Sequence, residues 1–159
     1  MSLFDRRTLL CLPLVLAACG FTPVYGTQGS GTALTNSVLV SEPDGLDGYL
    51  VTRRIEERLG RASTPRYRLT IDVETEREGL AVNPENNTNR FNIIGTLDYV
   101  LVEDATGRVI TSGVVDNFTG SSATGTTVAT LAAERDARER LMTLLADQVV
   151  ARLLATDLS

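Results

Sequence analysis

The feature that most constrains this chain is a series of three segments, between residues 65 and 118, in which apolar and polar side chains alternate. Every second residue from Tyr67 to Val73 is apolar, and the pattern returns in Arg90–Glu103 and in Arg108–Phe118. A period of two is typical of β-strands with one buried and one solvated face. The turn sequence Asp104–Gly107 joins the last two segments and indicates a hairpin. These residues therefore predict three strands in a meander, with Arg90–Glu103 in the centre because it is apolar on both faces.

Two helices and a short strand complete the expected fold. An apolar stripe at helical spacing predicts helices over Asp47–Leu59 and Val128–Ala155, and Ser37–Ser41 reads as a first strand. The polar stretches 79–89 and 119–127 read as connections. We predict an α+β two-layer sandwich, in which a mainly antiparallel sheet of about four strands carries two helices on one face.

The composition argues against an enzyme. The 159 residues include no His, and all 15 basic residues are Arg. Without an imidazole, the common nucleophile–base pairs and zinc sites cannot be built, so we expect no catalytic residues and no metal. The carboxylate pairs Glu56-Glu57 and Glu103-Asp104 read as solvated surface rather than as a general acid and base. A formal net charge of −5 argues against nucleic-acid binding.

The N-terminus has the pattern of an export signal. An apolar run follows Arg6 and Arg7 and ends in Leu16-Ala17-Ala18-Cys19. This ending resembles the lipobox of bacterial lipoproteins. The resemblance implies cleavage between Ala18 and Cys19, with a diacylglyceryl group and an N-acyl chain such as palmitate on Cys19. More than one long acyl chain makes membrane anchoring effectively permanent.

The chain then divides into three parts. Residues 1–18 are expected to be a lipoprotein signal peptide, 19–36 a lipidated N-terminus with a flexible tether, and 37–159 a single α+β domain. The tether is read from the Gly, Ser and Thr content of Gly26–Thr35. Gly20, which follows the cysteine where inner-membrane lipoproteins often carry Asp, favours the outer membrane by the same resemblance.

Several short motifs resemble the LptE family of lipopolysaccharide-assembly lipoproteins. The first is the start of the mature chain, Cys-Gly-Phe-Thr-Pro-Val-Tyr over Cys19–Tyr25. The others are Arg66–Leu69 at the opening of a strand, Arg90-Phe91 before the long strand, and Asp136-Ala137 and Ala146–Leu153 in the last helix. Together the resemblance covers most of residues 19–155.

The resemblance implies a non-catalytic role in the Gram-negative outer membrane. Members have two helices on a four-stranded sheet, plug the lumen of the LptD β-barrel and bind lipopolysaccharide. The resemblance therefore implies two partners for this chain, an LptD-type barrel and lipopolysaccharide. Arg90 matches a family position implicated in lipopolysaccharide contact, and Arg66 and Arg68 are further candidates. Some members also carry a Lys near the start of the last helix, whereas residues 126–133 contain no basic side chain.

A second interpretation remains open on the sequence. The chain would then be another small outer-membrane-anchored lipoprotein with a tethering or transport-accessory role, built on the same α+β layer.

Overall fold

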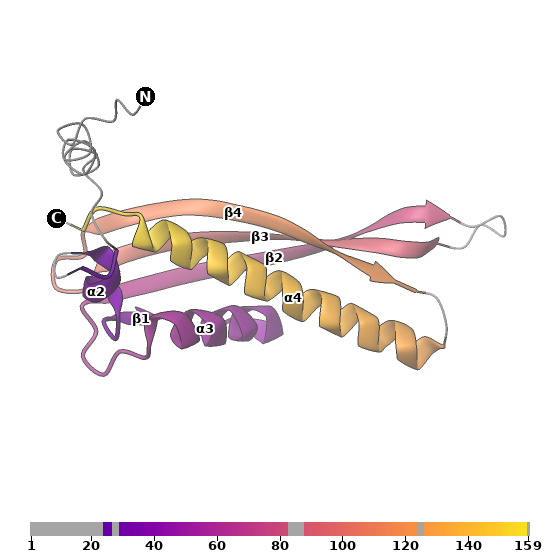
Figure 1. The fold of residues 1–159 in the computed structure, drawn as a ribbon, viewed down its shortest axis with the longest axis horizontal. Coiled ribbons are helices and arrows are strands. Elements are labelled where there is room, and N and C mark those ends of the chain that lie inside the picture. Colours follow the sequence, from indigo (N-terminus) through magenta and orange to yellow (C-terminus); the bar gives the residue numbers. More distant parts are fainter. Residues whose placement is uncertain (1–23, 27–28, 83–87, 124–125, 159) are drawn as a thin grey trace, which may run out of the picture.

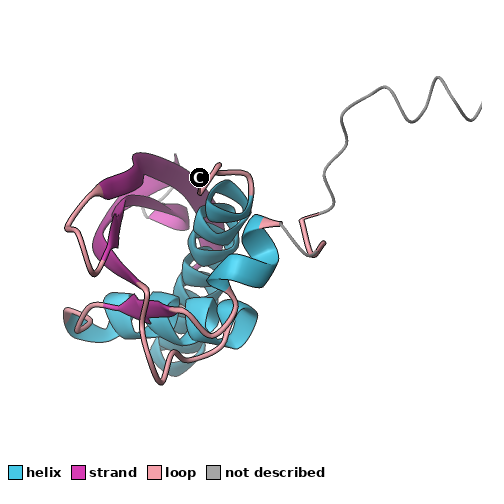
Figure 2. Ribbon diagram, turned by 90° about the vertical axis from the view of Figure 1, so that its left-hand side faces the viewer, coloured by secondary structure: helices cyan, strands magenta, loops and turns pink. Residues whose placement is uncertain are grey.

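The computed structural model describes residues 24–26, 29–82, 88–123 and 126–158. The described elements are, in chain order, α2 (Ser30–Leu34), β1 (Val38–Val40), α3 (Gly45–Leu59), β2 (Tyr67–Val82), β3 (Thr88–Glu103), β4 (Val109–Ser122) and α4 (Thr127–Leu154). One four-stranded sheet, in the order β1-β2-β3-β4, carries the helices on one side and leaves the other side uncovered (Figures 1 and 2).

The sheet is mixed but mostly antiparallel, as the alternation predicts. β2 pairs antiparallel with β3 and β3 with β4, while the short β1 pairs parallel with the start of β2, Val38 opposite Tyr67. β3 lies between two long partners, which agrees with its apolar character on both faces. The predicted α+β class and the predicted helices on one face of a four-stranded sheet are confirmed.

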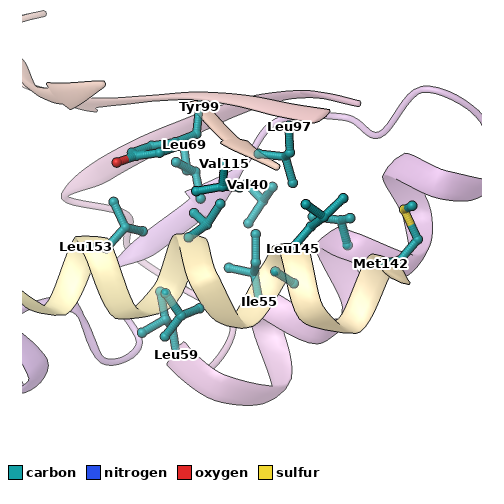
Figure 3. Packing of buried hydrophobic residues seen from close by; sticks show 14 of the residues in the cluster. Val40, Ile55, Leu59, Leu69, Leu97, Tyr99, Val115, Met142, Leu145 and Leu153 are labelled. Atoms are coloured by element: carbon teal, nitrogen blue, oxygen red, sulfur yellow. The ribbon is translucent and has the colours of Figure 1, made fainter. Parts of the chain in front are cut away.

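The core lies between the sheet and the two long helices. The odd-numbered residues of β3 from Ile93 to Leu101 face the helices and are buried, and α4 places Leu141 and Leu145 against Gly95. Figure 3 shows Leu97 and Tyr99 on the sheet and Leu145 on α4. Gly95 allows the close approach, because a Cβ there would lie 2.9 Å from Leu145 Cδ1 and 3.0 Å from Leu141 Cδ2. The helix–sheet spacing thus depends on one missing side chain.

Arginine–carboxylate pairs join the outer surfaces of α3 and α4. Arg54 donates two hydrogen bonds of 3.0 Å to the carboxylate of Asp147, and Arg58 adds a third contact at 3.3 Å. The hydrogen bond to Asp147 raises the pKa of Arg54. The two helices are therefore held together at the surface as well as in the core.

Both long helices begin close to their predicted starts. Asp44 takes the N-cap position of α3 without making a side-chain cap hydrogen bond. Thr126 caps α4 by accepting from the backbone N–H of Ala129. In the predicted apolar stripe of α4, Leu144 differs from its neighbours because it is exposed.

Two predicted connections are partly strand. β2 runs on to Val82 and β3 starts at Thr88, so residues 79–82 and 88–89 of this stretch belong to the two strands, with register shifts between Gly79 and Val82. Likewise β4 continues to Ser122. There Thr119 is buried and its hydroxyl donates to the carbonyl of Ala137 in α4 at 2.8 Å. Backbone pairing with a neighbouring strand, rather than an apolar pattern, extends these strands.

The N-terminal segment differs from the expected tether. Residues 30–34 form the short helix α2, and Leu34 is fully buried in the core. Gly31 packs so closely on the preceding turn that a Cβ would lie 2.9 Å from the ring of Tyr25. The Ser30 hydroxyl hydrogen-bonds to the carbonyl of Leu154 at the end of α4. The folded part therefore begins before residue 37, while residues 1–23 lie outside the described residues.

Candidate functional site

The molecule is elongated and its two ends differ (Figure 1). The proximal end holds α2, the start of β2, the turn between β3 and β4, and the C-terminus of α4. The distal end holds the far part of the β2–β3 hairpin and the first turns of α4. β2 and β3 extend past the N-terminal end of α3 together with β4, so among the described helices α4 alone runs on beside them at the distal end.

Arg90 lies at the distal end, near the start of β3. It pairs with Ala81 of β2 and Ser122 of β4, and register places it on the helix-free face, since Phe91 and Ile93 alternate with it. Its side chain is exposed, and it forms no ion pair with any described residue. A cation without a carboxylate partner at a strand end is available to an anion.

Arg66 and Arg68 lie at the proximal end. Arg68 donates to the carboxylate of Asp104 at 2.7 Å, and Arg66 lies 3.9 Å from Glu103 and over the ring of Tyr67. Both guanidinium groups therefore already have acidic neighbours in the adjoining turn.

The three arginines predicted to contact lipopolysaccharide do not form one site. Arg68 and Ala81, the partner of Arg90, are thirteen residues apart on the same strand. At about 3.4 Å per residue this corresponds to roughly 40 Å. Their binding role stays a prediction, but Arg90 acts separately from Arg66 and Arg68.

A groove that we call the distal groove lies between α3, α4 and β2. Its volume is about 450 Å³. It is lined by residues of the α3 N-terminus, mid-β2 and the first half of α4: Asp44, Gly45, Leu46, Asp47, Val73, Leu131, Glu134, Arg135 and Arg138. Leu46 and Leu131 are exposed leucines on its walls, so the groove is both apolar and charged.

Most of the charges in and around the distal groove neutralise one another. Arg138 donates to Asp47 Oδ2 at 2.7 Å, and Arg77 lies 3.7 Å from Glu134 while stacking on the ring of Phe91. Arg135 forms no ion pair within the described part of the chain. Arg135 and Arg138 lie within about one turn after residues 126–133, the helix start in which the sequence has no basic side chain. The same sequence signal, taken over that further turn, indicates both residues.

The described residues give no sign of reaction chemistry. Among them, no three His, Cys, Asp or Glu side chains gather closely enough to hold a metal ion. None of the helices in the described ranges has the length and apolar character needed to cross a bilayer. The described residues present three kinds of surface: the distal groove, exposed arginines and an uncovered sheet face.

With this architecture established, comparison with known proteins identifies the family. The lipopolysaccharide-assembly family LptE matches residues 34–153, which span β1, both long helices and the three long strands. The chain belongs to the LptE family. Comparison with curated proteins yields no match.

Solved structures share the LptE-type fold at low sequence identity. A protein from Caulobacter crescentus CB15 described as a lipoprotein has 21% identity and a TM-score of 0.66, covering 79% of this chain and 93% of its own. The rare lipoprotein B from Shewanella oneidensis has 14% identity and a TM-score of 0.59, covering 75% and 92%. An uncharacterized lipoprotein B from Nitrosomonas europaea has 16% identity and a TM-score of 0.57, covering 75% and 82%. At such identity these structures show a common fold alone.

LptE membership bears on the prediction that the chain is not an enzyme, and it leaves the lipid-attachment prediction untested. The family is one of non-catalytic, lipopolysaccharide-assembly lipoproteins, which agrees with the expectation from composition that this chain is not an enzyme. The lipid-attachment residue Cys19 and the cleavage position at Ala18 lie outside the described residues, and their roles remain predictions.

Proposed function

We propose that this chain is an outer-membrane lipoprotein that plugs an LptD-type β-barrel and helps deliver lipopolysaccharide to the cell surface. The observation that carries the proposal is the LptE family match over residues 34–153, which covers the whole core of the fold. An elongated two-layer body with no gathered catalytic groups among its described residues suits a plug better than an enzyme.

The proposed anchor is a diacylglyceryl and N-acyl lipid on Cys19. Only four residues lie between Cys19 and Val24, the first described residue, and the five Cα–Cα steps that join them span at most about 18 Å. The turn at Val24 packs against α2 and so against the proximal end. The membrane attachment point would thus lie near the proximal end, with Arg90 far from it.

Affinity purification of the tagged chain from its native envelope, in mild detergent, tests the plug proposal. The expected result is co-purification of an outer-membrane barrel identified by mass spectrometry as LptD-type, together with loss of surface lipopolysaccharide on depletion. Recovery of the chain without any barrel would reject the plug role. Unchanged surface lipopolysaccharide would favour the tethering or accessory role instead.

The same preparation tests the proposed anchor. Cys19→Ser should remove the mass of the lipid from the purified chain, and an unchanged mass would reject the proposed anchor.

The lipopolysaccharide contact is proposed at Arg90 first, because Arg66 and Arg68 are already bound to acidic side chains. Arg90→Asp reverses a charge that has no ion-pair partner among the described residues, and it should weaken binding to lipopolysaccharide micelles by on the order of tenfold, with a smaller effect at high salt. Arg66→Asp makes the same charge change at the proximal end of the sheet and compares the two candidate contacts directly. Equal binding by wild type and Arg90→Asp at low salt would remove Arg90 from the site.

A further inference from the structure

The side of the sheet that no helix covers carries an unusual set of charges. Six carboxylates lie on this helix-free face of β2, β3 and β4: Asp72, Glu74, Glu76, Glu78, Asp98 and Asp116. All six are exposed, and none forms an ion pair with a described residue. Asp72 and Asp98 are direct cross-strand partners, an arrangement in which like charges repel.

The acidic residues on the helix side of the molecule differ from these six, because they are paired with arginines. Every acidic residue of α3 and α4 forms an ion pair with an arginine: Asp47, Glu56, Glu57, Glu134, Asp136, Glu139 and Asp147. Arginines therefore neutralise the acids of the helices, whereas the six carboxylates of the helix-free face form no ion pair with a described residue. Arg68 and Arg90 also lie on this face, but at its two ends.

Apolar side chains are set among these carboxylates. Val114 and Phe118 of β4 are 49% and 61% exposed, and Val100 of β3 is 37% exposed. Register puts Phe118 opposite Ile94 and Val114 opposite Asp98. Exposed apolar side chains gathered on one uncovered sheet face are typical of a contact surface, and the acids among them would set the charge of the partner.

We infer that the helix-free face of β2, β3 and β4 is a docking surface for a protein wall that presents arginine or lysine side chains together with apolar ones. The inference rests on the proposed function and names the face by which the plug meets its barrel. Charge decides the occupant. A second copy of this face and an anionic membrane surface are negative, so the six carboxylates would repel each of them. Lipopolysaccharide is negative too, and its proposed contact Arg90 lies at the distal end of the face, beyond the carboxylates. A basic wall would neutralise the carboxylates while covering Val114 and Phe118.

Charge reversal on the two faces tests the inference. The test variant is Asp98→Arg with Asp116→Arg on the helix-free face, and the matched control is Glu57→Arg with Asp136→Arg on α3 and α4. Both variants change the charge equally at exposed positions. The barrel recovered per tagged chain should fall by on the order of tenfold for the test variant, and by less than about twofold for the control.

The outcomes separate the two proposals. If the wild-type chain retains its barrel and the test variant retains it equally well, the docking face is wrong and the plug role stands. If the wild-type chain retains no barrel, the plug role is wrong. Circular dichroism checks folding, and Asp98→Asn with Asp116→Asn, which removes charge without reversing it, should give an intermediate loss if the arginine variant fails to fold.

Photocrosslinking examines the face without assuming which protein covers it. A benzophenone side chain placed at Val114 on the sheet, or at Leu144 on α4, probes two positions of similar exposure, 49% and 42%. The expected crosslink from Val114 joins a protein segment rich in arginine or lysine. Crosslinks from Val114 only to lipopolysaccharide, to lipid or to a second copy of the chain would overturn the inference.

Discussion

The two faces of the sheet differ in the burial of their apolar side chains and in the pairing of the carboxylates near them. On the helix face, residues such as Leu97 and Leu101 are fully buried against α4 and the nearby carboxylates of the helices are paired with arginines. On the helix-free face, Val114 and Phe118 remain exposed beside unpaired carboxylates. The same three strands form both faces, because alternate residues point to opposite sides.

The difference shows that stability and contact are assigned to separate residue sets. Burial of apolar side chains contributes about 25 cal/mol per Å² removed from water, and that contribution comes from the helix face. The helix-free face adds like-charge repulsion, which a partner of opposite charge would offset. Substitutions on the two faces should therefore differ in size and, for charged residues, in sign.

The largest effect is expected from removing a core side chain. Leu145 is fully buried against β3, so Leu145→Ala should cost about 2–5 kcal/mol of unfolding free energy. Val114→Ala on the half-exposed face should cost about 0.5 kcal/mol or less. Urea unfolding followed by circular dichroism, in the non-lipidated Cys19→Ser background, measures both. Equal costs would mean that the two faces are equally buried in the isolated chain, which would contradict the contrast between buried Leu145 and half-exposed Val114.

A pair of glycine substitutions should show a smaller contrast. A side chain at Gly95 meets Leu141 and Leu145 at about 3 Å, whereas at Gly120 the nearest atom is Asn92 Oδ1 at 4.0 Å. Gly95→Val should therefore destabilise the fold by about 1–3 kcal/mol through overpacking. Gly120→Val should change it by less than about 1 kcal/mol in either direction. The same unfolding assay applies, and a well-tolerated Gly95→Val would show that α4 can move away from the sheet.

Local sequence patterns predict much of this architecture. The alternation from Tyr67 to Val73 and along β3 predicts which residues face the helices, and Ile93, Leu97 and Leu101 are buried as expected. The stripe along α4 predicts its buried face for the same reason, although Leu144 is exposed. Periodicity works here because a single core imposes one burial direction on each element.

Other features depend on contacts between residues far apart in the sequence, which a local pattern does not predict. The distal part of the β2–β3 hairpin is held by backbone pairing between strands, so its polar residues read as a loop. Helix α2 is read as a tether because its small residues lack a stripe, yet Leu34 is buried by the distant end of α4. The separation of Arg90 from Arg68 likewise depends on strand register, which the sequence leaves open.

The smallest predicted effect is the one that distinguishes the faces by sign. Asp98 lies opposite Asp72 on the helix-free face, so Asp98→Asn should raise the unfolding free energy by about 0.2–1 kcal/mol. Asp136 pairs with Arg140 on α4, so Asp136→Asn should lower it by about 0.3–0.5 kcal/mol. Added salt screens the repulsion and should stabilise the wild-type chain more than Asp98→Asn. A loss of stability in Asp98→Asn, or the same salt response in both chains, would show that the acidic face carries no repulsion for a partner to relieve.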